Sequence, residues 1–314
     1  MIKTGILGGD SHKAGELIRL LVLHPEVELL FVVAPALRGQ AISSFHRGMI
    51  GETDLKFSDS FNPEDLNMLF VTDVAYLSDS FPESLKVVVY ADDQFASLSD
   101  VAEGSTFVPA VSEMFRKPLV RGAKSSMVMP SCISVAMIAL FPLALHLMLN
   151  ESLSVKVNLP KFKSPVVSEE VMEKEIVRLL NLVQLSFDKF RGVKIENSNL
   201  LRTISLELEL DSDVDEEEIK RIYNSIYDDH NFTFVVRTEP APTEVAGTQK
   251  CLIYVHKSPE GKIRIKALAD SFLRGGAGDA IHAMNLLFGL YEKTGLSLPA
   301  SMAFKHNEFT PEEA

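Results

Sequence analysis

The first third of the chain consists of short, almost continuously apolar runs, each followed by a turn or a stretch with helical spacing. The first run, residues 2–7, ends in Gly8-Gly9, and leucines then recur at helical spacing over residues 14–24. Runs without polar alternation are typical of strands buried on both faces, so they predict a parallel sheet covered by helices. The predicted strands of this sheet are residues 2–7, 28–34, 68–72, 86–90 and 126–130.

The pattern changes after Leu149. Residues 202–210 (RTISLELEL) alternate strictly, as a half-buried antiparallel strand does. A helix is predicted over residues 168–190, with one apolar face formed by Met172, Ile176, Leu179, Val183 and Phe187. The other predicted elements are strands at 152–158, 233–237, 250–256 and 262–269, a helix from about Asp215 and a last helix at 275–290.

Together the two patterns predict an α/β fold with a Rossmann-type, doubly wound parallel sheet plus an α+β domain with a largely antiparallel sheet. A chain of 314 residues suits one large or two modest domains. We expect a dinucleotide-binding domain at 1–132, rejoined by a C-terminal helix at 275–314, and an α+β domain at 133–274. Residues 239–247 (EPAPTEVAG) are the expected linker.

Composition narrows the possible partners. Asp and Glu outnumber Lys and Arg by 43 to 31, and the net charge of −12 argues against nucleic-acid and membrane-surface binding. Residues 132–149 carry no formal charge and reach the lower limit for a membrane span. They include Pro142 and His146, and we expect a buried helix instead. The opening residues lack a signal-peptide pattern and only two cysteines occur, so we expect a cytoplasmic protein without a disulfide.

The segment Gly8-Gly9-Asp10-Ser11-His12-Lys13-Ala14-Gly15 lies between a predicted strand and a predicted helix, where dinucleotide-binding folds have their glycine-rich turn. Such a turn lets the backbone approach a pyrophosphate at the helix N-terminus. Ser11 stands where the usual pattern has glycine, and its hydroxyl could donate a hydrogen bond. Asp10 adds a negative charge and Lys13 a positive one. A strand–helix turn without a ligand is the alternative.

The end of the second predicted strand bears on the kind of dinucleotide. An acidic residue there would favour the 2′-hydroxyl of NAD, but no Asp or Glu occurs from Ala34 to Gly51. Arg38 is instead placed to receive a 2′-phosphate, which makes NADP the expected cofactor. A solvated surface arginine is the alternative.

Cys132 is the candidate nucleophile. It follows Met129-Pro130-Ser131 at the end of an apolar strand and opens the uncharged helix. A thiol at a helix N-terminus has its thiolate stabilised by the helix dipole, which suits attack on an acyl carbon. A small buried cysteine at the start of a core helix is the alternative. Cys251 has apolar neighbours in mid-strand, and we expect it to be inert.

An acidic run at 211–218 superficially resembles a calcium-binding loop. The glycine needed at the sixth position is Glu216, and the glutamate needed at the twelfth is Ile222. The acidic first turn of a helix explains the run. No cluster has metal-ligand spacing, so no metal site is predicted, and the eight scattered histidines give no candidate base.

Several segments, taken in order, resemble the N-acetyl-γ-glutamyl-phosphate reductase family, a relative of aspartate-semialdehyde dehydrogenase, over nearly the full chain. The opening GILGGDSHKAGELIRLLVLHPEVEL is similar to the family's strand, glycine loop and helix. ALADSFLRGGAGDAIHAMNLLFGLYEKTGL is similar to its Asp-Asn-Leu-x-Lys-Gly-Ala-x-Gly-Gln-Ala segment and the helix after it. GTQKC resembles its Gly-Thr-Asn-x-Cys, and MPSC resembles its Asn-Pro-Gly-Cys nucleophile motif.

This resemblance implies an oxidoreductase of the arginine biosynthesis type, which reduces a small-molecule acyl phosphate to a semialdehyde with NADPH through a thioester on Cys132. It also implies a homodimer or homotetramer, with residues 133–274 as the substrate and dimerisation domain. Together with Arg38, which was proposed above from its place after the second strand, the candidate cofactor-binding residues form one set. They are Gly8, Gly9, Ser11, His12, Lys13, Ala14, Arg38, Gly275, Gly276 and Ala277. The candidate substrate contacts are Asp93, Glu113 and Ser131.

The chain departs from the family at its proton-transfer and anion-binding positions. The family's His-x-His-x-Pro-Glu aligns with residues 170–175, where only the last Glu remains and Met172 falls on an apolar helix face. Its His-Gly falls on Ala75-Tyr76, and a substrate-binding Arg falls on Phe95. Two alternatives therefore stay open. One is a non-catalytic relative that keeps the fold without the catalytic histidine and substrate loop, and the other is a cysteine acyl-transfer protein without hydride chemistry.

Overall fold

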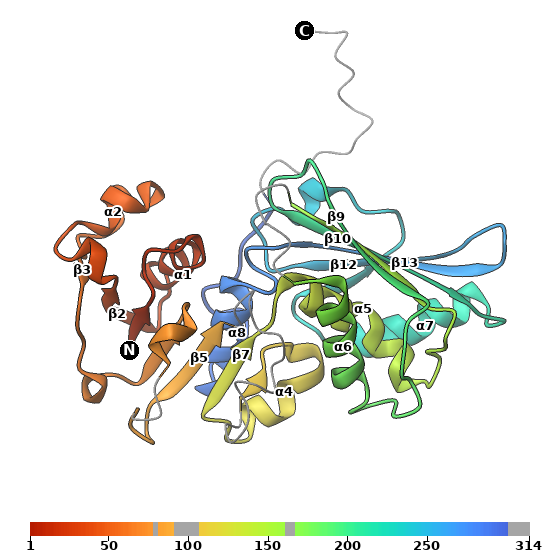
Figure 1. Ribbon diagram of the computed structural model, residues 1–314, viewed down its shortest axis with the longest axis horizontal. Coiled ribbons are helices and arrows are strands. Elements are labelled where there is room, and N and C mark those ends of the chain that lie inside the picture. The colour runs from red at the N-terminus through yellow and green to blue at the C-terminus, as the bar shows by residue number, and fades with distance from the viewer. Residues whose placement is uncertain (78–80, 91–106, 161–166, 301–314) are drawn as a thin grey trace, which may run out of the picture.

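Two β-sheets organise the computed structural model, which describes residues 1–77, 81–90, 107–160 and 167–300 (Figure 1). Seven parallel strands form the first sheet, in the order β3-β2-β1-β4-β5-β7-β6. They are β1 (Ile2–Leu7), β2 (Val27–Val33), β3 (Phe57–Ser58), β4 (Met68–Val71), β5 (Lys86–Tyr90), β6 (Val108–Pro109) and β7 (Ser125–Val128). All five predicted strands are present, and β4 is buried along its whole length, as a central parallel strand must be.

Helices α1 (His12–Val22) and α8 (Ala277–Leu287) pack against each other beside the first sheet. Although α8 comes from the far end of the chain, it also contacts β5, β7 and α4 (Ser112–Val120). Figure 1 shows this blue helix next to the orange and yellow strands. Apolar residues of α1 and α8 join one buried cluster, so the first sheet is covered by segments from both ends of the sequence.

The shorter elements around the first sheet are turns of helix. They are α2 (Ile42–Phe45), η1 (Pro35–Leu37), η2 (Arg47–Met49), η3 (Pro63–Asp65) and η4 (Val74–Tyr76), where η denotes a 3₁₀ helix.

Six strands form the second sheet, in the order β11-β12-β13-β10-β8-β9. They are β8 (Ser154–Leu159), β9 (Gly192–Asn197), β10 (Thr203–Asp211), β11 (Thr233–Val236), β12 (Cys251–Lys257) and β13 (Lys262–Asp270). Three of the five strand pairs are antiparallel, and β11–β12 and β8–β9 are parallel. The predicted fold class, with a parallel sheet and a largely antiparallel one, is confirmed.

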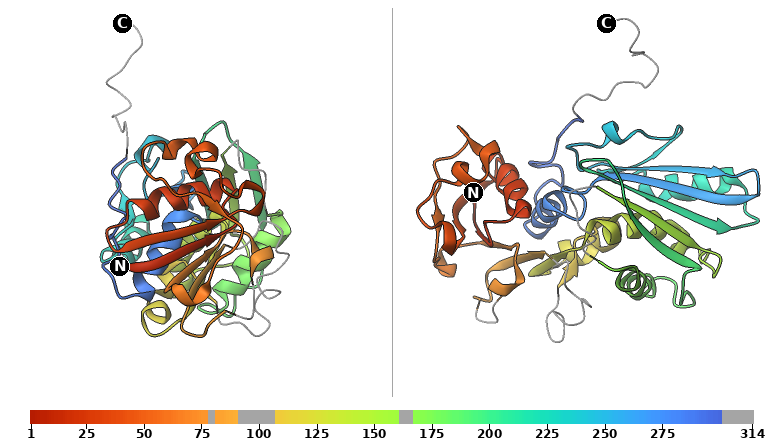
Figure 2. Two further views of the ribbon diagram at one scale, coloured as in Figure 1. Left: turned by 90° about the vertical axis from the view of Figure 1, so that its left-hand side faces the viewer. Right: turned by 45° about the horizontal axis from the view of Figure 1, so that its top comes forward.

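Helices α5 (Ser131–Leu145), α6 (Glu169–Leu180) and α7 (Glu216–Tyr227) pack onto the second sheet and share one apolar cluster with it. Figure 1 shows these helices below the strands, and the right-hand view of Figure 2 shows the green α6 on the same side, away from the other face of the sheet. That other face, here called the open face, has a hollow of about 550 Å³. Its lining includes Lys156, Lys194, Glu207, Tyr254, His256 and Arg264.

Two predictions about this region are wrong. The helix predicted over 168–190 is too long, because α6 ends at Leu180 and the chain then turns back into β9, which was not predicted. Phe187 is buried after the helix, in a turn where its ring packs edge-on against Phe190. The expected linker at 239–247 is no linker, because it joins β11 and β12, which are neighbours in one sheet, and it contains the turn η5 (Pro242–Glu244).

Most of the uncharged segment at 132–149 is a buried helix, as predicted, but the helix ends at Leu145, and His146 and Leu147 are exposed. Apart from Phe141 and Leu145, every residue of α5 is buried between the second sheet and its neighbouring helices. Within the described residues, no helix is long and apolar enough to cross a membrane. Neither Cys132 nor Cys251 takes part in a disulfide, and both are buried.

Candidate active site

Three of the segments singled out in the sequence meet at the carboxyl edge of the first sheet. Strands β1 and β7 are parallel members of that sheet, so the turn after β1 and the start of α5 after β7 lie at the same edge. The turn before α8 packs directly on the start of α5. A Cβ added to Gly275, which has a φ of +66°, would lie 2.3 Å from the Ser131 Cα atom.

The turn after β1 requires glycine at positions 8 and 9, because a side chain would not fit there. Gly8 has a φ of +86°, and a Cβ at Gly9 would lie 2.2 Å from a methyl carbon of Val32. The N–H groups of both glycines donate to the Val33 carbonyl, at 3.1 and 2.8 Å. The turn is thereby fixed to the end of β2.

Ser11 has a structural role in this turn. Its hydroxyl oxygen accepts a hydrogen bond from the Ala14 N–H at 3.1 Å and caps α1. The same hydroxyl donates to the Gly8 carbonyl at 3.4 Å. The serine therefore holds the turn and the helix start together.

The turn fits an anionic cofactor group. Within the described part of the chain, no hydrogen bond uses the backbone N–H groups of Asp10 and Ser11, which precede α1. Unpaired amides at a helix N-terminus attract phosphate oxygens. The Asp10 side chain is exposed, and the exposed His12 ring packs edge-on against Phe272, with 6.1 Å between ring centroids. Lys13 is half-buried.

Arg38 lies beyond the end of β2, as expected, but it has a partner that the sequence did not suggest. One of its terminal nitrogens (Nη1) lies 2.6 Å from Oδ2 of Asp59, which follows the short strand β3. The arginine side chain is 72% exposed. A 2′-phosphate could therefore reach Arg38, in competition with Asp59.

Cys132 is the second residue of α5, so its thiol lies in the first turn of a fifteen-residue helix. The residue is 4% exposed. Cys251 is completely buried in β12, where burial raises the pKa of its thiol to about 12. Cys132 thus lies at the start of the uncharged helix, as predicted, whereas Cys251, predicted in mid-strand, is the first residue of β12.

Met172, aligned with a family histidine, is fully buried in α6 within the same apolar cluster as Cys132. It packs as a core residue, as expected, and its thioether cannot carry a proton. Glu175, the one residue of that segment that matches the family motif, is buried and accepts a hydrogen bond from the Arg178 Nε at 2.8 Å.

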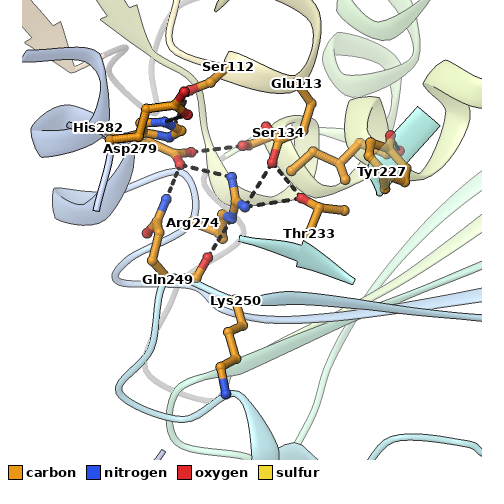
Figure 3. Close-up of polar contacts among 12 residues, drawn as sticks. Ser112, Glu113, Ser134, Tyr227, Thr233, Gln249, Lys250, Arg274, Asp279 and His282 are labelled. Atoms are coloured by element: carbon orange, nitrogen blue, oxygen red, sulfur yellow. Dashed lines mark hydrogen bonds and ion pairs between the residues drawn. The ribbon is translucent and has the colours of Figure 1, made fainter. Parts of the chain in front are cut away.

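A completely buried arginine, Arg274, organises the polar contacts around this site (Figure 3). Its Nη2 atom lies 2.8 Å from the Glu113 carboxylate and 3.2 Å from the Thr233 hydroxyl. Its Nε donates to the Gln249 carbonyl at 2.8 Å, and Nη1 lies 3.4 Å from Asp279. This cluster, here called the Arg274 network, links α4, α8 and the second sheet.

The pKa values of the two carboxylates in the Arg274 network are shifted in opposite directions. Burial by itself would raise the pKa of Glu113, but the Arg274 charge and the Thr233 hydroxyl lower it to about 2. Burial raises the pKa of Asp279, although Arg274 and a backbone N–H favour its ionised form. Glu113 is therefore the firmly ionised partner of the arginine.

Asp279 connects the Arg274 network to the cysteine helix. Its Oδ2 accepts hydrogen bonds from the Ser134 hydroxyl at 2.9 Å and from the Gly275 N–H at 2.7 Å. Ser134 lies two residues after Cys132 in α5. The aspartate thus holds the Gly275 turn over the start of that helix.

Sequence reasoning found only part of this arrangement. Neither Arg274 nor Asp279 was predicted to have a role. The available signal was a pair of opposite charges flanking the glycines of an otherwise apolar segment. The substrate roles of Glu113 and Ser131 stay predictions: both are buried, and one Glu113 oxygen is used by Arg274. Asp93 lies outside the described residues.

Of the remaining cofactor candidates, Ala14 is buried in α1. Gly276 caps α8, and Ala277 is the first residue of that helix. These two lie beside the Gly275 turn, so the structure brings the candidates from both ends of the chain to one edge of the sheet.

Comparisons with known proteins give close relatives over almost the whole chain. The chain is 32% identical to N-acetyl-gamma-glutamyl-phosphate reductase of Parabacteroides distasonis, over 96% of this chain and 99% of that protein. It shows the same identity and coverage with the Bacteroides fragilis protein of that name. Residues 197–270 match a family model described as the dimerisation domain of semialdehyde dehydrogenase.

Solved structures share the fold at low sequence identity. Aspartate semialdehyde dehydrogenase II from Vibrio cholerae, complexed with ASA, has a TM-score of 0.67 at 12% identity, covering 93% of this chain and 99% of that one. Aspartate semialdehyde dehydrogenase from Candida albicans, with NADP, also has a TM-score of 0.67, at 16% identity, covering 92% and 98%.

Proposed function

The chain belongs to the N-acetyl-gamma-glutamyl-phosphate reductase family, and we propose that it reduces an acyl phosphate to a semialdehyde with NADPH through a thioester on Cys132. The observation that carries the proposal is the shared edge of the first sheet. The glycine turn after β1 and the thiol after β7 both lie there. Hydride transfer to an enzyme-bound thioester requires a nucleotide and a thiol held close together.

NADP would be held by the glycine turn and the start of α1, with Arg38 directed at the 2′-phosphate. Among the described residues the Asp10 and Ser11 N–H groups have no hydrogen-bond partner, which supports this, as does the NADP complex of the Candida albicans relative. The Gly275 turn, with Gly276 and Ala277, would close the site from the side of α8. Bound there, the reduced cofactor supplies a hydride.

Cys132 would act as the nucleophile. The dipole of α5 stabilises its thiolate, which attacks the acyl carbon; a C–S bond forms, the C–O bond to phosphate breaks, and inorganic phosphate leaves. After hydride addition to the thioester carbonyl, the C–S bond breaks and returns the thiolate with the semialdehyde. Because Met172 cannot carry a proton, this position supplies no general acid–base catalysis, which is commonly worth about 10²–10⁴-fold in rate.

We further infer that the substrate is N-acetyl-γ-glutamyl phosphate or a close analogue, as in arginine biosynthesis. The names of the relatives support this choice. Asp93, Glu113 and Ser131 remain the predicted substrate contacts.

We also infer a homodimer or homotetramer built through the open face of the second sheet. The match to a dimerisation domain over residues 197–270 supports this, because β10, β11, β12 and β13 lie within that range. The hollow on the open face is the part of that surface that a second copy would fill.

The test is the reverse reaction, which avoids an unstable acyl phosphate. N-acetylglutamate semialdehyde, phosphate and NADP⁺ are supplied to the wild-type chain, Cys132→Ser and Cys251→Ser, and NADPH formation is followed by absorbance. We expect turnover by the wild type and by Cys251→Ser, and at least about 10³-fold less by Cys132→Ser, because a hydroxyl is a far weaker nucleophile at neutral pH.

NADPH binding without turnover of any of several semialdehydes would contradict the enzyme proposal and favour the non-catalytic relative. Turnover that survives Cys132→Ser would contradict the thioester route alone.

A further inference from the structure

His46 lies on the glycine turn, although it is 37 residues away from Gly9 in the sequence. Its Nε2 is 2.7 Å from the Gly9 carbonyl oxygen, and since a carbonyl only accepts, the Nε2–H group donates. The half-buried imidazole is held by ring contacts with Phe45 and Phe57, whose centroids lie 5.0 and 6.0 Å away. The His46 backbone N–H donates to the Ile42 carbonyl at 2.8 Å, so the residue is fixed at both ends.

The imidazole also rests on Gly15 in the first turn of α1. A Cβ added to Gly15 would lie 2.6 Å from His46 Nδ1 and 3.1 Å from Cε1. The backbone of Gly15 is helical, without the positive φ that would call for glycine. Glycine within a helix costs about 1 kcal/mol relative to alanine. The space occupied by His46 accounts for this unfavourable residue.

The hydrogen bond from His46 has a consequence for the next residue. The Gly9 carbonyl and the Asp10 N–H belong to one planar trans peptide group, so they point in opposite directions. Holding the carbonyl toward His46 turns the Asp10 N–H away from it. Glycine at position 9 allows a rotation of this peptide group that a bulkier residue resists, and a rotated carbonyl would repel a pyrophosphate.

We propose that His46 is a positioning residue of the dinucleotide site, which holds the Gly9–Asp10 peptide group so that the Asp10 N–H donates to the pyrophosphate. The inference rests on the proposed NADP-binding function. His46 acts through the glycine turn and is not a catalytic residue. Gly15 belongs to the same device, because it makes room for the imidazole.

The test measures the NADPH dissociation constant by fluorescence, together with the melting temperature, for the wild type and four variants. His46→Phe keeps a ring but loses the donor, and we expect about tenfold weaker NADPH binding, which corresponds to one lost orienting hydrogen bond. His46→Gln retains an N–H donor, and we expect binding within about twofold of the wild type. In turnover assays, His46→Phe should raise KM for NADPH and leave kcat at saturation unchanged.

Gly15→Ala gives the sharpest separation from a merely structural role. Alanine favours the helix, so we expect an unchanged or higher melting temperature, yet about tenfold weaker NADPH binding because the methyl group displaces His46. Gly48→Ala is the matched control. It lies two residues from His46, and nothing lies within 4 Å of its added Cβ, so binding should not change.

A wild-type chain that binds NADPH, together with a Gly15→Ala chain that binds it equally well, overturns the role of His46 and leaves the proposed function standing. Equal binding by a folded His46→Phe does the same. A wild-type chain that does not bind NADPH overturns both the cofactor proposal and this inference.

Discussion

Arg274 makes the surroundings of Cys132 sensitive to single substitutions. Its charge is completely buried, and it contacts two carboxylates, the ionised Glu113 from α4 and Asp279 from α8. Removing one partner of a buried ion pair commonly costs about 3–5 kcal/mol, because a charge is left uncompensated. The Arg274 network also holds the Gly275 turn through Asp279. Because that turn packs on Ser131, loss of the network should also disturb the start of α5.

The pH dependence of stability follows from Glu113. Its pKa in the folded chain is about 2 and its ordinary value is 4.5, so its stabilising effect is complete above 4.5 and is lost as the pH falls toward 2. The raised pKa of Asp279 acts in the opposite sense, because its protonation at low pH favours the folded state. We expect urea unfolding between about pH 5 and pH 2 to show a steeper loss of stability for the wild type than for Glu113→Gln.

Equal slopes for the two proteins would contradict the ionised state of Glu113. Thr233→Val is the control, since it removes the hydroxyl that donates to Glu113 and leaves the charge pair in place. It should shift the curve by a smaller amount.

Thiol reactivity should separate the two cysteines. Cys132 lies in the first turn of α5, whereas Cys251 is completely buried and the pKa of its thiol is raised to about 12. We expect iodoacetamide at about pH 7.5 to modify Cys132 at least about tenfold faster, as read by peptide mass spectrometry. The Cys132→Ser chain should be labelled only at the slow rate of Cys251 under the same conditions. Equal rates for both thiols would argue against an activated Cys132.

At the scale of elements, a helix or strand is predicted correctly where the apolar pattern of its sequence matches the way its side chains are buried. All five longer strands of the first sheet were found, because their apolar runs have no competing interpretation. The helix predicted over residues 168–190 was too long. Val183 and Phe187 continue the helical spacing, although the chain leaves the helix at Asn181. Strand β9 was missed because GVKIEN carries only two apolar side chains, which are too few to show a strand pattern.

Capping of α1 by Ser11 can be tested against an equivalent cap elsewhere. Ser11 accepts from the Ala14 N–H, and Ser168 accepts from the Val171 N–H at the start of α6. Each serine-to-alanine change should cost about 1 kcal/mol of unfolding free energy. Only Ser11→Ala should also weaken NADPH binding, since Ser11 holds the glycine turn. Equal NADPH affinity for both variants would exclude Ser11 from the cofactor site.

At the scale of the whole molecule, the fold class was predictable and the Arg274 network was not. Strands and helices leave periodic patterns, but a contact such as Arg274–Glu113 joins residues far apart in the sequence and has no local signature. His46 was missed for the same reason, because its partner Gly9 precedes it by a whole strand and helix. The sequence motifs predicted that the site lies at the carboxyl edge of the first sheet. They did not predict which side chains hold its parts in place.

The open face of the second sheet provides a test of assembly. Tyr254 lines its hollow and stacks on His256, with 5.3 Å between ring centroids and 19° between planes. We expect Tyr254→Glu to lower the mass found by sedimentation velocity toward that of a monomer, because it adds an unpaired charge at the interface. Tyr291→Glu is the control, as that side chain is exposed elsewhere. An unchanged mass for Tyr254→Glu would exclude this face.

The position of α8 has a consequence for how the chain is made. The first sheet is complete in sequence at Val128, but the helix that shares its apolar cluster ends at Leu287. At about 5–20 residues per second, a ribosome delivers that helix about ten to thirty seconds later. During that interval the nascent first sheet exposes an apolar surface to chaperones, and its folding is completed only when the end of the chain returns to the beginning.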